Sequence, residues 1–105
     1  MEYLKFEFTG KQTWTPQKSF ALAGVVSSGN LEILMEKYDL GGQMSIDVET
    51  TIKGFEDTWR AVFEDFYIKH PLSDLRISIH DTGATPAVVS LRLDQAIELI
   101  RGIDS

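Results

Sequence analysis

Two adjacent serines, Ser27 and Ser28, are the residues of this sequence best placed to do chemistry, because Gly29 and Asn30 follow them directly. Glycine and asparagine both tolerate the positive φ angles of a tight turn, so the tetrapeptide predicts an exposed turn. Such a serine usually has no role beyond the turn. Glycine also removes side-chain bulk, however, so a modifying enzyme could reach the neighbouring hydroxyl. The tetrapeptide is therefore a candidate modification site.

The two histidines do not predict a metal site. His70 and His80 fall on different expected elements, and neither has a second histidine at the spacing of a metal-binding helix. His80 precedes Asp81, so these two side chains could form an acid–base pair. A histidine at the end of a strand, with no chemical role, explains the same residues.

Asp81 also begins an Asp-Thr-Gly-Ala tetrapeptide that resembles the active-site loop of retroviral-type aspartic proteases. Those enzymes are homodimers whose mechanism needs two carboxyl groups sharing one proton. The chain after Ala84 is too short for their flap and later strands, and its hydrophobic period is helical. A four-residue match is also unspecific, so the protease is the weaker hypothesis.

Composition limits the classes of function that are open to the chain. Its 105 residues include 10 basic and 16 acidic side chains, a net charge of −6, whereas nucleic-acid binders usually carry a basic patch. It has no cysteine, which excludes a disulfide scaffold and a thiol nucleophile. No apolar run reaches the ~18 residues of a transmembrane helix, and no signal peptide is evident. We expect one domain over residues 1–105, in the cytoplasm, that binds neither nucleic acid nor membrane.

Hydrophobic periodicity predicts the elements that must position these residues. Alternating apolar residues predict strands, and apolar residues at helical spacing predict helices. We expect strands at about 4–8, 20–26, 31–35, 44–52 and 75–79, and helices at about 55–67 and 86–101. Thr85 and Pro86 suit the start of the last helix, although 88–91 would also suit a strand.

The element order β-β-β-β-α-β-α predicts an α+β fold. We expect a two-layer sandwich, with a mostly antiparallel sheet and both helices on one of its faces. The second and third strands should form a hairpin that is closed by a short turn at Gly29 and Asn30.

Longer runs of sequence resemble a known family. The run Ala-Leu-Ala-Gly-Val-Val-Ser-Ser-Gly-Asn-Leu-Glu at 21–32 is similar to the modification segment of the malonate decarboxylase acyl carrier (delta) subunits. The run Ile-Ser-Ile-His-Asp-Thr-Gly-Ala-Thr-Pro-Ala-Val-Val at 77–89, continued by Leu-Arg-Leu-Asp-Gln-Ala at 91–96, is the strongest match. The citrate lyase acyl carrier (gamma) subunits are more distant relatives.

The resemblance implies a non-catalytic carrier. Members of the family hold 2'-(5''-phosphoribosyl)-3'-dephospho-CoA on a serine through a phosphodiester, and by register that serine is Ser28, with Ser27 the less favoured site and Gly29 and Asn30 beside it. The thiol of the arm carries acetyl and malonyl groups, which suits a chain without cysteine. The implied partners are acyl-transferase and decarboxylase subunits, and the holo-carrier synthase (a phosphoribosyl-dephospho-CoA transferase) that attaches the arm.

Two departures from the family pattern keep alternatives open. The family usually has glycine before the modified serine and aspartate after the glycine, where this chain has Ser27 and Asn30. Ser27 makes the attachment site ambiguous, and Asn30 removes a carboxylate that a transferase could recognise. An unmodified protein-interaction domain of the same fold and a citrate-lyase-type acyl carrier therefore remain as alternatives.

Overall fold

The computed structural model describes residues 1–23 and 30–102. Its elements follow the predicted order, with five strands and two helices. They are β1 (Glu2–Thr9), β2 (Phe20–Ala23), β3 (Leu31–Lys37), β4 (Gln43–Thr50), α1 (Glu56–Lys69), β5 (Leu75–Asp81) and α2 (Pro86–Arg101). The last helix has the predicted bounds, and the fourth strand ends two residues before the predicted end at 52.

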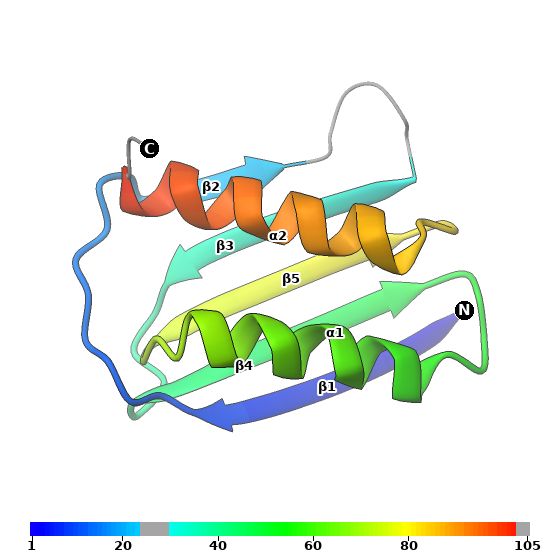
Figure 1. Ribbon diagram of the computed structural model, residues 1–105, viewed down its shortest axis with the longest axis horizontal. Coiled ribbons are helices and arrows are strands. Elements are labelled where there is room, and N and C mark those ends of the chain that lie inside the picture. Colours follow the sequence, from blue (N-terminus) through cyan, green and yellow to red (C-terminus); the bar gives the residue numbers. More distant parts are fainter. Residues whose placement is uncertain (24–29, 103–105) are drawn as a thin grey trace.

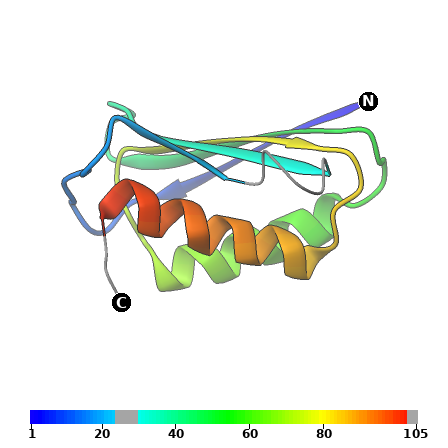
Figure 2. The same cartoon turned by 90° about the horizontal axis from the view of Figure 1, so that it is seen from above.

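The strands form a single sheet in the order β1-β4-β5-β3-β2. β5 lies between β3 and β4, parallel to β4 and antiparallel to β3, and the two outer pairs are antiparallel. Both helices cover the same face of this sheet, and no helix in the described part of the chain lies on the opposite face (Figures 1 and 2). The predicted α+β two-layer sandwich with a mostly antiparallel sheet is therefore confirmed.

The core fills the space between the sheet and the helices, because the period-two pattern of each strand sends its apolar side chains to one face. The central strands contribute Ile33, Ile46 and Ile77, each fully buried. Phe63 of α1 packs edge-on against Phe6 of β1, with 5.1 Å between the ring centroids. The helices are thereby fixed over the sheet by side chains from elements far apart in sequence.

The last helix starts where its capping residues predict. Thr85 has an extended backbone, and its Oγ1 accepts a hydrogen bond from the N–H of Val88 at 3.3 Å, with Pro86 in the first turn. A cap of this kind satisfies one of the N–H groups that have no partner inside the helix. The cap sets the position at which α2 leaves the turn after β5.

Asp74 organises the loop between β3 and β4. Its Oδ1 accepts hydrogen bonds from the backbone N–H groups of Leu40 and Gly42, both at 2.9 Å. These hydrogen bonds favour the ionised carboxylate and lower the pKa of Asp74 below its ordinary value. Gly41 and Gly42 both take positive φ angles in this loop, which glycine adopts without steric cost.

Loss of the cap tests the start of α2. We expect Thr85→Ala to lower the free energy of unfolding by about 1 kcal/mol, because the Val88 N–H loses its acceptor. Thr85→Ser is the matched control, because it keeps the hydroxyl and should stay close to wild type in urea denaturation. Equal destabilisation by both substitutions would contradict the capping role.

The Asp74 carboxylate predicts a pH dependence. Because its folded-state pKa is lowered, its contribution to stability is complete above the unfolded value of about 3.9 and is lost as the pH falls through the folded pKa. Asp74→Asn keeps an oxygen acceptor but removes the charge. We expect the variant to be less stable than wild type at pH 7, and the difference to shrink at about pH 3. A stability difference that is the same at both pH values would count against this assignment.

Candidate functional site

The candidate site lies at the end of the sheet where the parallel strands β4 and β5 finish and β3 begins. Asp81, the last residue of β5, is opposite Thr50 of β4 on one side and Leu31 of β3 on the other. Both helices also begin at this end (Figure 1). The carboxyl ends of neighbouring parallel strands are a common place for ligand sites in open sheets.

Asp81 holds this end together. Its side chain points into the core and is only 4% exposed. Oδ2 accepts a hydrogen bond from Thr50 Oγ1 at 2.8 Å, and Oδ1 accepts one from the Ala84 N–H at 2.8 Å. The carbonyl of Asp81 also accepts from the Thr51 N–H at 3.1 Å. One acidic residue therefore links the end of β4, the end of β5 and the turn into α2.

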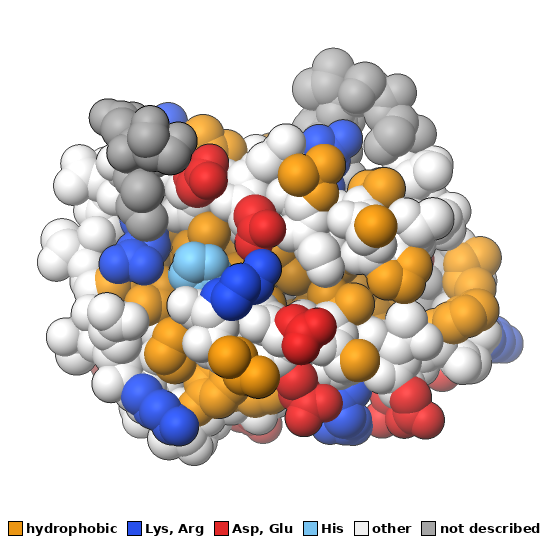
Figure 3. Space-filling view, viewed as in Figure 1, with side chains coloured by type: hydrophobic (Ala, Val, Ile, Leu, Met, Phe, Trp, Pro, Cys, Tyr) orange, Lys and Arg blue, Asp and Glu red, His pale blue; other side chains and the backbone are white. Residues whose placement is uncertain are grey.

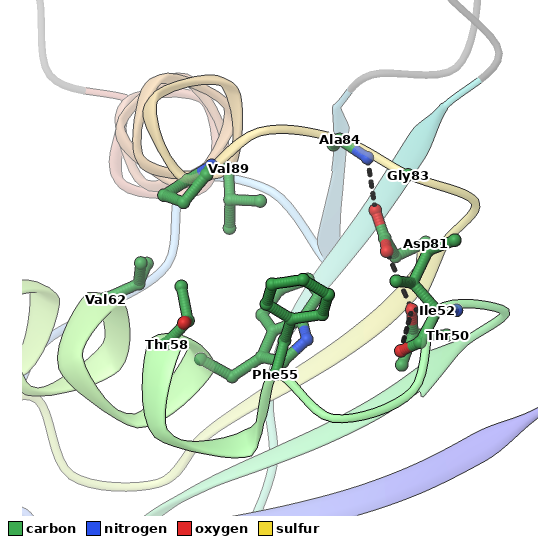
Figure 4. A pocket seen from close by; sticks show the side chains of 11 residues that line it. Thr50, Ile52, Phe55, Thr58, Val62, Asp81, Gly83, Ala84 and Val89 are labelled. Atoms are coloured by element: carbon green, nitrogen blue, oxygen red, sulfur yellow. Dashed lines mark hydrogen bonds between the residues drawn. The ribbon is translucent and has the colours of Figure 1, made fainter.

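A cavity of about 520 Å³ opens beside this carboxyl group. Its walls come from the end of β4 and the loop after it, the first turns of α1, the turn after β5, and the start of α2 (Figure 4). Phe55, Thr58, Val62 and Val89 reach it from the helix side, while Thr50 and Asp81 form its sheet side. The eleven lining residues are Thr50, Ile52, Phe55, Thr58, Trp59, Val62, Asp81, Gly83, Ala84, Pro86 and Val89.

Of the four residues predicted as the modification site, only Asn30 is among the residues that the structure describes. Ser27, Ser28 and Gly29 lie outside them. Asn30 is exposed, and its carbonyl accepts a hydrogen bond from the Thr82 N–H at 2.8 Å. Asn30, the first described residue after Ala23, therefore lies directly beside the turn that forms one wall of the cavity.

The predicted short turn at Gly29 and Asn30 falls partly outside the described residues, because Gly29 is not among them. The strands on either side are described, and they pair Ala23 with Ile33 and Phe20 with Glu36. The antiparallel pairing of β2 and β3 that a hairpin requires is confirmed, and the turn itself stays a prediction.

His80 and Asp81 do not form the acid–base pair considered from the sequence. Adjacent strand residues point to opposite faces of a sheet, so Asp81 enters the core while His80 lies on the face without helices. There, His80 Nδ1 is 3.6 Å from Glu49 Oε2, its neighbour on β4. This placement agrees with the other explanation, a histidine at the end of a strand, because neighbouring residues of a strand do not share a face.

His70 lies at the opposite end of the sheet, after α1. Burial disfavours its charged form and lowers its pKa below the ordinary value, against the smaller opposing effect of Asp94. Across residues 1–23 and 30–102, no cluster of three or more His, Cys, Asp or Glu side chains could hold a metal ion.

The hydrophobic pattern of β4 contains a signal that singles out Thr50. Met44, Ile46 and Val48 alternate along the buried face of β4, and the next inward position is Thr50; Asp81 continues the buried series of β5 in the same way. A polar side chain on a buried strand face needs a hydrogen-bond partner. Two such residues at strand ends indicate a shared contact, once the strand order is known.

A double-mutant cycle tests the contact between Thr50 and Asp81. We expect Asp81→Ala and Thr50→Val each to reduce the free energy of unfolding by about 1–3 kcal/mol, because each leaves a buried polar group without its partner. The double variant should lose clearly less than the sum of the two single losses. Strictly additive losses in urea denaturation would show that the two side chains do not stabilise one another.

Comparison with known proteins shows what this arrangement is similar to. A protein family model described as the malonate decarboxylase delta subunit (MdcD) matches residues 18–100. A malonate decarboxylase acyl carrier protein of Xanthomonas campestris pv. campestris (strain B100) is 51% identical over 105 residues, which is the full length of both chains. One from Stenotrophomonas maltophilia (strain K279a) is 52% identical over 100 residues, 95% of this chain and 94% of that protein.

A solved structure shares the fold as well. A chain in the crystal structure of a Pseudomonas malonate decarboxylase hetero-tetramer in complex with malonate is 43% identical, with a TM-score of 0.78 over 93% of this chain and 97% of that one. These matches leave the protease hypothesis without support and favour malonate decarboxylase over citrate lyase. The chain belongs to the malonate decarboxylase acyl carrier protein family.

Proposed function

We propose that this chain, an acyl carrier subunit of malonate decarboxylase, carries acetyl and malonyl groups on a 2'-(5''-phosphoribosyl)-3'-dephospho-CoA arm that is attached to Ser28. Bound in this way, the arm would supply a thiol that holds the acyl groups as thioesters. The chain itself has no cysteine and could not supply that thiol. The role of the protein is therefore to hold and present the group rather than to catalyse a reaction.

One observation carries the proposal. The predicted attachment segment is flanked by Ala23 at the end of β2 and by Asn30 before β3. Asn30 is exposed, and its carbonyl accepts a hydrogen bond from the turn after β5. A group attached between these two anchors starts at the end of the sheet that also holds the cavity. The residues present therefore fit a tethered group whose free end can reach either solvent or the protein surface.

Attachment would use Ser28 as a nucleophile once. Its Oγ would displace pyrophosphate from a triphosphorylated precursor and form the phosphodiester, while the hydroxyl proton passes to a base. Among the described residues at this end, Asp81 already accepts hydrogen bonds on both oxygens and His80 lies on the other face of the sheet. Neither is placed to act as that base, so we assign it to the transferase.

Because the proposed carrier presents the acyl group without catalysing a reaction, other subunits must act on that group. The Pseudomonas chain with the same fold comes from a hetero-tetramer with malonate bound. We propose that this chain likewise serves acyl-transferase and decarboxylase subunits, and that a separate synthase attaches the arm. A tethered acyl group reaches successive active sites at a high effective concentration, because each encounter is intramolecular.

In the described ranges, neither helix is long and apolar enough to cross a bilayer.

Replacement of each serine in turn tests the attachment site. We expect Ser28→Ala to abolish loading by the purified synthase and precursor, and Ser27→Ala to load fully. Intact mass before and after the reaction measures loading, and thermal unfolding confirms that both variants fold. Loading of Ser28→Ala with loss in Ser27→Ala would move the site to Ser27. No loading of the wild type, by a synthase active on a related carrier, would favour the unmodified interaction domain.

A further inference from the structure

The cavity at the end of the sheet has no assigned role, and its position suggests one. It lies between the starts of α1 and α2, where hydrophobic side chains gather on the helix face of the molecule (Figure 3). Two of its residues, Ile52 and Phe55, remain 41% and 49% exposed. Small-molecule sites in proteins are typically concave, mostly apolar and about 300–1,000 Å³ in volume, and this cavity of about 520 Å³ falls within that range.

The cavity is adjacent to the segment that carries the predicted attachment site. Asn30 ends that segment, and its carbonyl accepts the hydrogen bond from the N–H of Thr82. The neighbours of Thr82 in the chain, Asp81 and Gly83, both line the cavity. A flexible group that begins within a few residues of Asn30 therefore has the mouth of this cavity within reach.

The lining determines what the cavity can accept. Apolar side chains dominate it, the Thr58 hydroxyl faces it from α1 (Figure 4), and Asp81 is the single ionisable residue among the described residues that line it. Asp81 and Thr50 already bond to each other. Within residues 1–23 and 30–102, no lysine or arginine lines the cavity. A ligand carboxylate would therefore be buried there without a cation, which is costly. The cavity suits an uncharged, largely apolar ligand.

We infer that this cavity binds the acetylated pantetheine end of the protein's own arm and excludes the malonylated one. The inference rests on the proposed function, because the arm supplies the ligand. An acetyl thioester is uncharged and fits the lining, whereas the malonyl group brings a carboxylate. The carrier then shelters its acetyl group between encounters and leaves its malonyl group in solvent, open to the decarboxylating partner.

The binding does not need to be tight. A short flexible tether holds its free end at an effective concentration of the order of millimolar. An intrinsic dissociation constant of about 0.1–0.5 mM would then keep the acetyl group inside for most of the time, and would slow its attack by an outside nucleophile about threefold to tenfold.

The rate at which hydroxylamine reacts with the thioester measures this protection, and no catalytic partner is needed. The full chain is loaded with the arm, and the mass of the product is verified. Its thiol is then acylated by exchange with an acetyl or malonyl aryl thioester. Hydroxylamine attacks the thioester carbonyl, forms the hydroxamate and frees the thiol, so intact mass follows the loss of the acyl group. Free S-acetyl- and S-malonyl-pantetheine give the unprotected rates.

We expect the acetyl group on the wild-type carrier to react about threefold to tenfold more slowly than the free thioester, and the malonyl group to react at the free rate. Thr58→Phe should fill the cavity from the exposed start of α1 and remove the protection. Ala61→Phe is the matched control, because Ala61 is exposed on the same helix but does not line the cavity. Thr58→Lys supplies the missing cation and should extend protection to the malonyl group.

Several results would overturn the inference. They are an unprotected acetyl group on the loaded wild type, equal protection of acetyl and malonyl groups, and protection that survives Thr58→Phe. Failure of Thr58→Lys to protect the malonyl group would refute the charge selectivity. Magnetisation transfer from a labelled acetyl methyl to the methyl groups of Val62 or Val89 should accompany protection. If the chain takes up no arm at all, the proposed function is contradicted instead. Intact mass after the loading step identifies that case before any acyl group is tested.

Discussion

The buried carboxyl group of Asp81 is the constraint on which the functional end of this protein depends. A polar side chain that is 4% exposed needs partners, and Asp81 finds them on the Thr50 hydroxyl and the Ala84 N–H. Because those partners belong to β4 and to the turn into α2, the ends of the two parallel strands and the start of the last helix are held in one arrangement. The cavity walls and the position of Asn30 both follow from it.

The two ends of the sheet are built differently. At the far end, the loop after β1 is tied down by its own hydrogen bonds: Trp14 Nε1 donates to the Ser73 carbonyl at 2.7 Å, and the Gly10 N–H donates to the Gly42 carbonyl at 3.0 Å. Gly10 has no room for a side chain, since a Cβ atom would lie 2.3 Å from Ser73 Cα. At the near end, the described residues surround an open cavity instead. A carrier gains from this division, because one end fixes the fold and the other remains accessible.

Much of the fold could be predicted from local pattern. Alternation along β4 and helical spacing in α2, with Thr85 and Pro86 at its start, identify these elements because the deciding interactions lie within a few residues. The strand order could not be read in the same way. β5 pairs with both β3 and β4, and such contacts depend on packing between distant segments. The missed contact between Thr50 and Asp81 has this same origin, whereas the separation of His80 from Asp81 follows from the local alternation of strand residues.

The candidate site divides in the same manner. The attachment residues are predicted from the resemblance to a family to which the comparisons show that the chain belongs, and they stay a prediction, whereas the cavity could be found only in three dimensions. Its lining comes from four separate parts of the chain. Sequence alone shows each of these parts as ordinary core or turn. Together they form a mostly apolar lining beside Asn30, in which no described residue is a lysine or arginine.

The most direct measurement is the mass of the wild-type protein isolated from cells that also make its synthase, precursor enzymes and partner subunits. Intact mass with peptide fragmentation should show one phosphoribosyl-dephospho-CoA group, placed on Ser28. An unmodified mass, in cells where the same synthase loads another carrier, would contradict the carrier function. It would leave an interaction domain whose Ser27 or Asn30 has abolished recognition by the synthase.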